Sequence, residues 1–188
     1  MTVIGWDIGG VNIKAARVHA NAPLAARNDP FEIQRAPATL AARLEGIATA
    51  LGAEKADVHA ITMTAELSQF FRTKRDGVVY VLDAVERAFP AAHTFAYTVD
   101  GRFLDPAAAR QSPLLVAASI ANVRERHPKL ETAVIAGHGA FLARAAARRA
   151  GLRIAHDDLI TAGEPRAAGA EAAFAVARLL ERWLSSTS

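Results

Sequence analysis

The segment VIGWDIGGVNIKAARV, which opens the chain after Thr2, orders its residues in a way that suits phosphate chemistry. Asp7 ends one apolar run, two glycines follow, and Lys14 lies in the next run. Glycine lets backbone N–H groups approach an anion closely, and a carboxylate can hold Mg²⁺ directly or through water. We therefore expect Asp7 to bind the metal and the following residues to bind a phosphate. The expected phosphate ligands are Gly9, Gly10, Asn12 and Lys14.

Two strands must position these groups. Residues 2–7 and 11–18 are apolar enough for strands, and the glycines between them suit a hairpin that needs positive φ. A hairpin of this kind would place backbone N–H groups and Lys14 on one side and the Asp7 carboxylate on the other. The alternative is a purely structural hairpin with an exposed Asp7.

A second glycine turn lies in the last third of the chain. The segment GHGAFL begins at Gly137, between a strand predicted over 132–136 and a helix predicted over 141–150. Such a turn can bring a nucleotide or diphosphate against a helix N-terminus. We expect Gly137 and Gly139 to contribute backbone and His138 to reach the ligand. An ordinary connection between a strand and a helix is the alternative.

Polar residues also follow the strand predicted over 58–63. Thr62, Thr64 and Glu66 lie where this strand passes into a helix predicted to begin at Thr64, and a cleft commonly forms at such a junction. We expect Thr62 and Thr64 to contribute to phosphate or nucleotide binding there, and Glu66 could bind magnesium or a substrate amine. A capping threonine and a glutamate favoured by the helix dipole form the alternative.

The remaining pattern alternates helices with strands. Leu40, Leu44 and Ile47 recur at three- and four-residue steps, which predicts an amphipathic helix. Thr161 and Glu164 have the spacing of a capping box that would open the last helix, and the tail SSTS is expected to fray. This alternation favours an α/β fold with a partly parallel sheet. The other expected elements are helices over 38–51, from 76 and over 106–127, and strands over 93–99, 102–104 and 152–155.

Composition restricts the class of protein. The chain has 188 residues, of which 52% are hydrophobic and 22% charged, and its formal net charge is +3. Acidic and basic residues are interleaved, so nucleic acid and membrane are not the expected partners. The absence of cysteine fits a reducing cytoplasm, and no secretory signal or membrane span is expected. The six histidines lack zinc-ligand spacing.

Several of these segments together resemble a known family. DIGGVNIKAA is similar to the first phosphate motif of the actin-like ATPase superfamily, and VIAGHGAFLARAA to its adenosine-side motif. More narrowly, the opening segment, TMTAELSQFFRTKRDGV, YTVDGRF and AGHGAFL resemble the hydantoinase/oxoprolinase-related family of tetrahydromethanopterin-linked C1 transfer. That family includes a methanofuran-biosynthesis enzyme. The segment TMT-x-EL followed by KRDGV is the most specific part of the resemblance.

The resemblance implies a fold and an activity. It implies a shortened actin-like, ribonuclease H-like α/β fold, with a mixed sheet flanked by helices. It also implies a transferase that joins an aminomethylfuran-methyl diphosphate to a tyramine-type phenol with Mg²⁺. Asp7, Lys14 and Glu66 would be the catalytic residues. A non-catalytic binding or regulatory relative and an ATP-dependent small-molecule kinase are the alternatives.

Two departures from the family pattern affect these expectations. Ala65 stands where the family has glycine, and no second Asp-Ile-Gly hairpin occurs between Gly101 and Thr132. The phosphate site would then be open on one side, so we expect a second chain, as a homo-oligomer or assembly partner, to close it. We expect residues 1–130 to form a phosphate domain. Residues 131–188 would form an adenosine-motif segment packed on it; the alternative is one compact domain.

Overall fold

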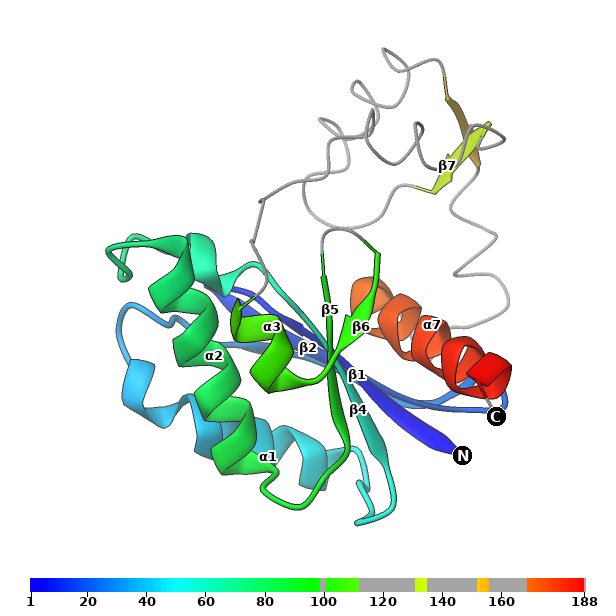
Figure 1. Ribbon diagram of the computed structural model, residues 1–188, viewed down its shortest axis with the longest axis horizontal. Coiled ribbons are helices and arrows are strands. Elements are labelled where there is room, and N and C mark those ends of the chain that lie inside the picture. The colour runs from blue at the N-terminus through cyan, green and yellow to red at the C-terminus, as the bar shows by residue number, and fades with distance from the viewer. Residues whose placement is uncertain (99–100, 112–130, 135–151, 156–168, 188) are drawn as a thin grey trace.

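The computed structural model describes residues 1–98, 101–111, 131–134, 152–155 and 169–187 (Figure 1). Its main feature is a six-stranded sheet of order β3-β2-β1-β4-β5-β6. The β1/β4 and β4/β5 pairs are parallel, whereas β1/β2, β2/β3 and β5/β6 are antiparallel. The sheet is therefore mixed. Its strands are β1 (Thr2–Ile8), β2 (Asn12–His19), β3 (Ala22–Pro30), β4 (Val58–Met63), β5 (Thr94–Tyr97) and β6 (Phe103–Leu104).

Helices cover both faces of this sheet (Figure 1). Helices α1 (Leu40–Ala50) and α2 (Lys74–Ala88) lie on one face, and α7 (Glu171–Thr187) lies on the other. The predicted α/β class, with a mixed sheet flanked by helices, is confirmed. No helix in the described part of the chain has the length and apolar character that a bilayer-crossing segment needs. The shorter elements are η1 (Pro37–Thr39), η2 (Ala65–Leu67), α3 (Pro106–Gln111) and a separate parallel pair, β7 (Thr132–Val134) with β8 (Arg153–Ala155).

Strand β1 is buried on both sides. Successive side chains of a strand point to opposite faces. Ile4, Trp6 and Ile8 accordingly pack in the core under α1 and α2. Val3 packs in a second core under α7, where the other large residues are Phe174 and Leu180. The central strand thus joins two cores, and its last residues carry the proposed chemistry.

Helix α7 approaches β1 very closely at Gly5. A Cβ built on Gly5 would overlap the carbonyl oxygen of Ala173 and lie 2.8 Å from Cβ of Ala177. Only a residue without a side chain permits this packing. Trp183, near the end of the same helix, places its ring 5.4 Å from that of Phe95. The last helix therefore packs on the sheet.

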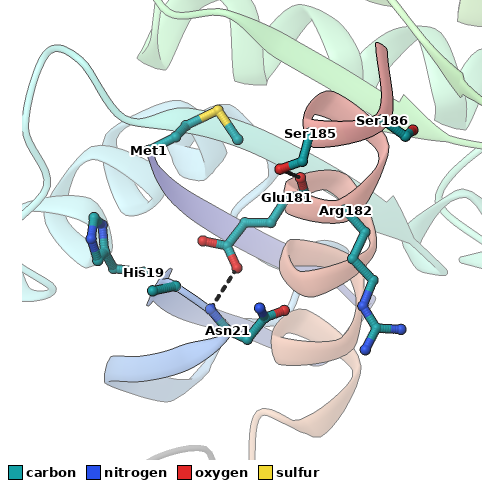
Figure 2. Close-up of a pocket in the computed structure, with 8 residues that line it drawn as sticks. Met1, His19, Asn21, Glu181, Arg182, Ser185 and Ser186 are labelled. Carbon is teal, nitrogen blue, oxygen red and sulfur yellow. Dashed lines mark hydrogen bonds between the residues drawn. The ribbon is translucent and has the colours of Figure 1, made fainter. Parts of the chain in front are cut away.

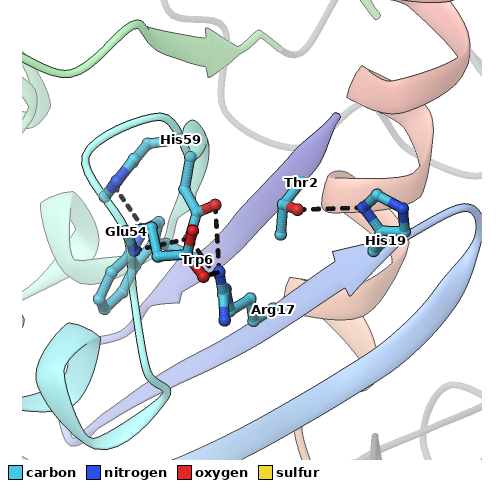
Figure 3. Close-up of polar contacts among 7 residues, drawn as sticks. Thr2, Trp6, Arg17, His19, Glu54 and His59 are labelled. Atoms are coloured by element: carbon cyan, nitrogen blue, oxygen red, sulfur yellow. Dashed lines mark hydrogen bonds and ion pairs between the residues drawn. The ribbon is translucent and has the colours of Figure 1, made fainter.

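A buried polar contact lies within the other core. Trp6 Nε1 donates a hydrogen bond to Nδ1 of His59, at 3.2 Å (Figure 3). The ring centroid of Phe89 lies 4.3 Å from that of the imidazole. Only 3% of His59 is exposed. Burial disfavours the charged imidazolium and lowers the pKa of His59 to about 4. The side chain is therefore neutral at pH 7, with its proton on Nε2.

Strand β3 was not expected, because its segment is polar and contains Pro23 and Pro30. It is an edge strand, where a proline needs no partner for the missing N–H. The turn that leads into it has positive φ at Ala20 (49°) and Asn21 (62°). These values are typical of a type I′ hairpin turn.

Helix boundaries also differ from the prediction. The helix expected from Thr64 is one 3-10 turn, η2, and α2 begins at Lys74 instead of Asp76. Thr73 forms the N-cap, since Asp76 N donates to its hydroxyl while Thr73 N donates to the Asp76 carboxylate. Helix α7 includes Ser185, Ser186 and Thr187, which were expected to fray, so that expectation is wrong for these three residues; Ser188 lies outside the described residues. The capping box at Thr161 and the helix expected after residue 111 lie outside the described residues.

Substitution of Gly5 by alanine should detach α7 from the sheet. The added methyl group meets backbone, which cannot move aside alone, so we expect a loss of about 1–3 kcal/mol or more in the free energy of unfolding. Urea denaturation measures it. Gly46→Ala is the matched control, because a Cβ on Gly46 of α1 has no heavy atom within 4 Å. That change should be neutral or stabilising. Equal effects of the two changes would contradict the close packing.

The buried His59 should make stability depend on pH. Its folded-state pKa, about 4, lies below the ordinary value of 6.5, so only the unfolded chain binds a proton between these values. The free energy of unfolding is therefore unaffected by this group above pH 6.5, and should fall by up to about 3 kcal/mol as the pH drops to 4. His59→Gln removes this titration. Unfolding free energies measured from pH 4 to 7 should fall less steeply for the variant; parallel curves would exclude His59 as the cause.

Candidate functional site

Three sequence-predicted side chains meet on one face of the sheet, at the carboxyl ends of β1 and β4. Asp7 is the register partner of Lys14 on β2 and of Thr62 on β4. Register partners project to the same face, which here is the face covered by α7. The Lys14 ammonium donates to Oδ2 of Asp7 at 2.9 Å. A carboxylate, an ammonium and a hydroxyl group thus share this end of the sheet.

The pairing differs from the expected arrangement. Lys14 and Asp7 were expected on opposite sides of a phosphate, but they form an ion pair on one side. The reason is the antiparallel register, which sets the two residues directly opposite each other. The side chain of Asp7 is 12% exposed and that of Lys14 is 30% exposed. Solvent can therefore reach the ammonium more easily than the carboxylate.

The glycine hairpin is tighter than expected. Gly9 N donates to the carbonyl of Asn12 at 2.9 Å, so this N–H group is already used inside the turn. A Cβ on Gly9 would lie 2.9 Å from the same carbonyl oxygen. Neither Gly9 nor Gly10 has positive φ, and the prediction that they need it was wrong. Gly9 is required instead for close backbone contact.

Gly10 lies at a more open position. Its carbonyl accepts a hydrogen bond from Ile33 N, and the nearest atom to a Cβ built there is Cβ of Ser68, at 3.9 Å. The hydroxyl of Ser68 lies 3.4 Å from Nε2 of Gln34. Ser68 and Gln34 are thus polar neighbours of the hairpin tip that sequence reasoning missed. Residue spacing gave no signal for either.

The segment after β4 lies against the same hairpin. Thr64 N donates to the carbonyl of Ile8 at 3.0 Å, and the hydroxyl of Thr64 lies 3.6 Å from a Cβ built on Gly9. Thr64 is exposed and Thr62 is half-buried. The two threonines therefore border the end of β1 from the β4 side.

Glu66 is the most unusual group in this region. Its Oε2 atom is buried and has no hydrogen-bond partner among the described residues. Burial raises the pKa of Glu66, while its own backbone N–H and the charge of Lys74 oppose the shift. A Cβ on Gly77 would lie 2.6 Å from Cα of Glu66, so glycine in the first turn of α2 permits this placement. A half-buried acid with a raised pKa is typical of a site that transfers protons.

Asn28 is a further neighbour that sequence reasoning missed. It is the register partner of Lys14 on β3, and its side-chain nitrogen lies 3.6 Å from a Cβ built on Gly169, just before α7. Recognising β3 would have placed Asn28 beside Lys14. The predicted ligands Gly137, His138 and Gly139 lie outside the described residues.

Two cavities lie away from this end of the sheet. One, of about 440 Å³, lies beside the C-terminal half of α7 and is lined by Met1, His19, Asn21 and Glu181, among others (Figure 2). Glu181 is 7% exposed and accepts a hydrogen bond from Asn21 N at 3.0 Å, which accounts for its burial. The other, of about 410 Å³, lies at the carboxyl ends of α1 and α2. Neither is lined by a predicted site residue.

An ion-pair network holds the start of β4 to β2. Arg17 donates to Asp57 at 2.8 Å and to Glu54 at 2.8 Å (Figure 3). Asp57 is 3% exposed, and its carboxylate also accepts from Glu54 N. These bonds raise the pKa of Arg17, with the bond to Asp57 contributing most. The described residues contain no cluster of three or more histidine or acidic side chains that could hold a metal ion.

One curated relative is similar to this chain. It is the (4-{4-[2-(gamma-L-glutamylamino)ethyl]phenoxymethyl}furan-2-yl)methanamine synthase of Methanocaldococcus jannaschii, 29% identical over 119 residues. The match covers 62% of this chain and 33% of the synthase, so the matched part is about a third of that relative's length. No protein-family model matches the chain.

A solved structure is also similar, at a low level. It is Thermus thermophilus RuvC in complex with a Holliday junction substrate, at 18% identity and a TM-score of 0.36. The similarity covers 52% of this chain and 64% of that one. Similarity at this level supports no conclusion about fold or partner, and the expected actin-like, ribonuclease H-like topology stays a prediction.

The stability of the Glu66→Gln variant relative to the wild type should increase as the pH rises. Because the folded state holds the Glu66 proton more tightly than the unfolded state does, ionisation above the raised pKa lowers the stability of the wild type. The neutral amide does not ionise. Unfolding free energies at pH 5 and pH 8 should therefore favour the variant more at pH 8. Glu45→Gln, an exposed change on α1, is the control and should show no such trend. A variant that gains nothing at pH 8 would show that burial does not disfavour the charge.

Proposed function

We propose that this chain acts in the biosynthesis of a methanofuran-type C1-carrier cofactor, as a transferase that displaces diphosphate from a furfuryl carbon. The match to the named synthase carries the proposal. That name describes an ether between a furan-bound methylene and a phenol bearing a γ-glutamylaminoethyl group. The grouping of Asp7, Lys14 and Thr62 at one end of the sheet supports it. Glu66 follows the same end of β4, in the η2 turn that packs against α2.

In the proposed reaction, the phenol oxygen attacks the furfuryl methylene. The new carbon–oxygen bond forms as the bond to diphosphate breaks, and the diphosphate leaves with the electron pair. Lys14 binds the leaving group, where negative charge grows in the transition state. Glu66 accepts the phenol proton; its raised pKa brings it closer to the range that suits a general base.

The residues fit a magnesium ion that arrives already bound to diphosphate. Mg²⁺ usually takes one or two protein carboxylates and fills its other positions with phosphate oxygens and water. Asp7 provides one carboxylate, Thr62 lies beside it on β4, and Thr64 follows the end of that strand. When bound, Mg²⁺ would supply positive charge at the diphosphate oxygens. A metal held by protein groups alone does not fit, because one carboxylate is too few.

Asp7→Asn should abolish the magnesium-dependent stabilisation by diphosphate. The melting temperature of the purified chain is measured with Mg²⁺ and inorganic diphosphate, each alone and together. Stabilisation scales with occupancy, so the wild type should melt several degrees higher only with both. Because the site is partly exposed, the shift should shrink between low and physiological salt. Asp29→Asn is the matched control, since Asp29 lies on β3 with its side chain on the opposite face from Lys14.

The outcomes separate the candidate functions. A shift that persists in Asp7→Asn would remove Asp7 from the site. A shift with ATP and Mg²⁺ but none with diphosphate would favour an ATP-dependent kinase. A third outcome is a chain that binds diphosphate but does not form the ether from the furfuryl diphosphate and γ-glutamyl-tyramine. If no ether forms even at protein concentrations at which the chain self-associates, a non-catalytic relative would be favoured.

A further inference from the structure

The cavity at the carboxyl ends of α1 and α2 has the properties of a small-molecule site. Its volume, about 410 Å³, lies within the range of ligand pockets. Its lining is mainly small and apolar, and Ala48, Ala53, Ala88 and Phe89 also pack in or against the core under α1 and α2. The cavity is therefore an extension of a core into the surface.

One buried polar group lines this apolar cavity. His59 is 3% exposed and its Nδ1 accepts from Trp6 Nε1, so the neutral ring carries its proton on Nε2. The imidazole can therefore offer a ligand a hydrogen-bond donor but no acceptor. The aromatic ring of Phe89, 4.3 Å from His59, provides a surface on which a flat ligand can pack.

The surroundings disfavour an anionic ligand. The last turn of α1 and the last turn of α2 both contribute to the lining, through Thr49 and Ala88, and the carboxyl end of a helix carries partial negative charge. Exposed Glu45, Glu54 and Lys55 also line the cavity. The nearby cation Arg17 forms an ion pair with Glu54 and is therefore already neutralised. The ligand best matched to these features is uncharged.

This cavity is separate from the Asp7 end of the sheet. His59 is the register partner of Ile4, and Thr62 that of Asp7, three residues further along both strands. The offset corresponds to about 10 Å along the strands. The two sites also lie on opposite faces, since Ile4 packs under α1 and α2 whereas Asp7 lies on the α7 face.

We propose that this cavity, lined by His59, Phe89 and five alanines, is a second binding site, for an uncharged aromatic molecule that carries a hydrogen-bond acceptor. The site is independent of the proposed transferase function. A bound molecule would contact His59 and Phe89, whose rings pack on Trp6, the residue immediately before Asp7. A bound molecule would therefore be linked through these rings to β1, next to the candidate site.

The lining alanines allow a direct test in the full chain. With alanine methyl groups labelled by ¹³C, p-cresol should cause saturable shifts of the resonances of Ala48, Ala53, Ala88, Ala91 and Ala92. Ala173 and Ala177, which lie under α7, should not respond. Toluene, which lacks the acceptor, should bind more weakly, and benzoate, which is charged, should not bind. No saturable shift up to about 10 mM p-cresol, or equal binding of benzoate, would overturn the proposal.

Variants that fill the cavity make the test specific. Ala53→Leu and Ala92→Leu each add three carbons to the lining at a half-buried position, and should weaken p-cresol binding at least tenfold. Ala42→Leu, exposed on α1 and outside the lining, is the matched control and should leave binding unchanged. The methyl spectrum shows whether each variant is folded. One folded filling variant is enough for the test. Unchanged binding in a folded filling variant would overturn the assignment to this cavity.

Discussion

The close contact between Gly5 and α7 determines where the chemistry of this chain can lie. Strand β1 is covered by α1 and α2 on one face and by α7 on the other. At Gly5, the backbone of β1 packs directly against the backbone of α7 at Ala173. Helix α7 begins at Glu171, two residues before Ala173. Gly169, which precedes the helix, lies beside Asn28, the register partner of Lys14. The polar groups Asp7, Lys14 and Asn28 therefore lie where helical cover of the sheet ends. A larger residue at position 5 would shift this boundary.

The Asp7–Lys14 ion pair follows from the same arrangement. A carboxylate that is 12% exposed at the end of a buried strand loses much of its hydration, and an opposite charge at 2.9 Å compensates for that loss. Removing Lys14 alone would leave a poorly hydrated carboxylate, so the lysine has a structural role whether or not it binds a ligand. The response to magnesium and diphosphate distinguishes this structural role from ligand binding.

Periodicity and glycine placement predicted most of the sheet. Strands β1, β2 and β4 were located within a residue or so, because apolar runs bounded by glycine and polar residues are strong local signals. Strand β3 was missed because an edge strand pairs on one side only and can be polar. The Asp7–Lys14 pair was expected as two separate groups, since hairpin register depends on the turn and is not visible in composition. The Trp6–His59 contact joins residues 53 positions apart, and no local pattern reveals such a pair.

The ion pair also suggests how a diphosphate could bind at little electrostatic cost. Without ligand, Asp7 and Lys14 satisfy each other. A magnesium diphosphate brings a cation for Asp7 and an anion for Lys14, so one ion pair is exchanged for two and neither protein charge is left alone. Mg²⁺ alone would leave Lys14 without its partner, and diphosphate alone would leave Asp7, which is 12% exposed, as a poorly hydrated carboxylate, which is unfavourable near the low-dielectric core. Cooperativity between metal and diphosphate is therefore the property that distinguishes a working site from a structural ion pair at this strand end.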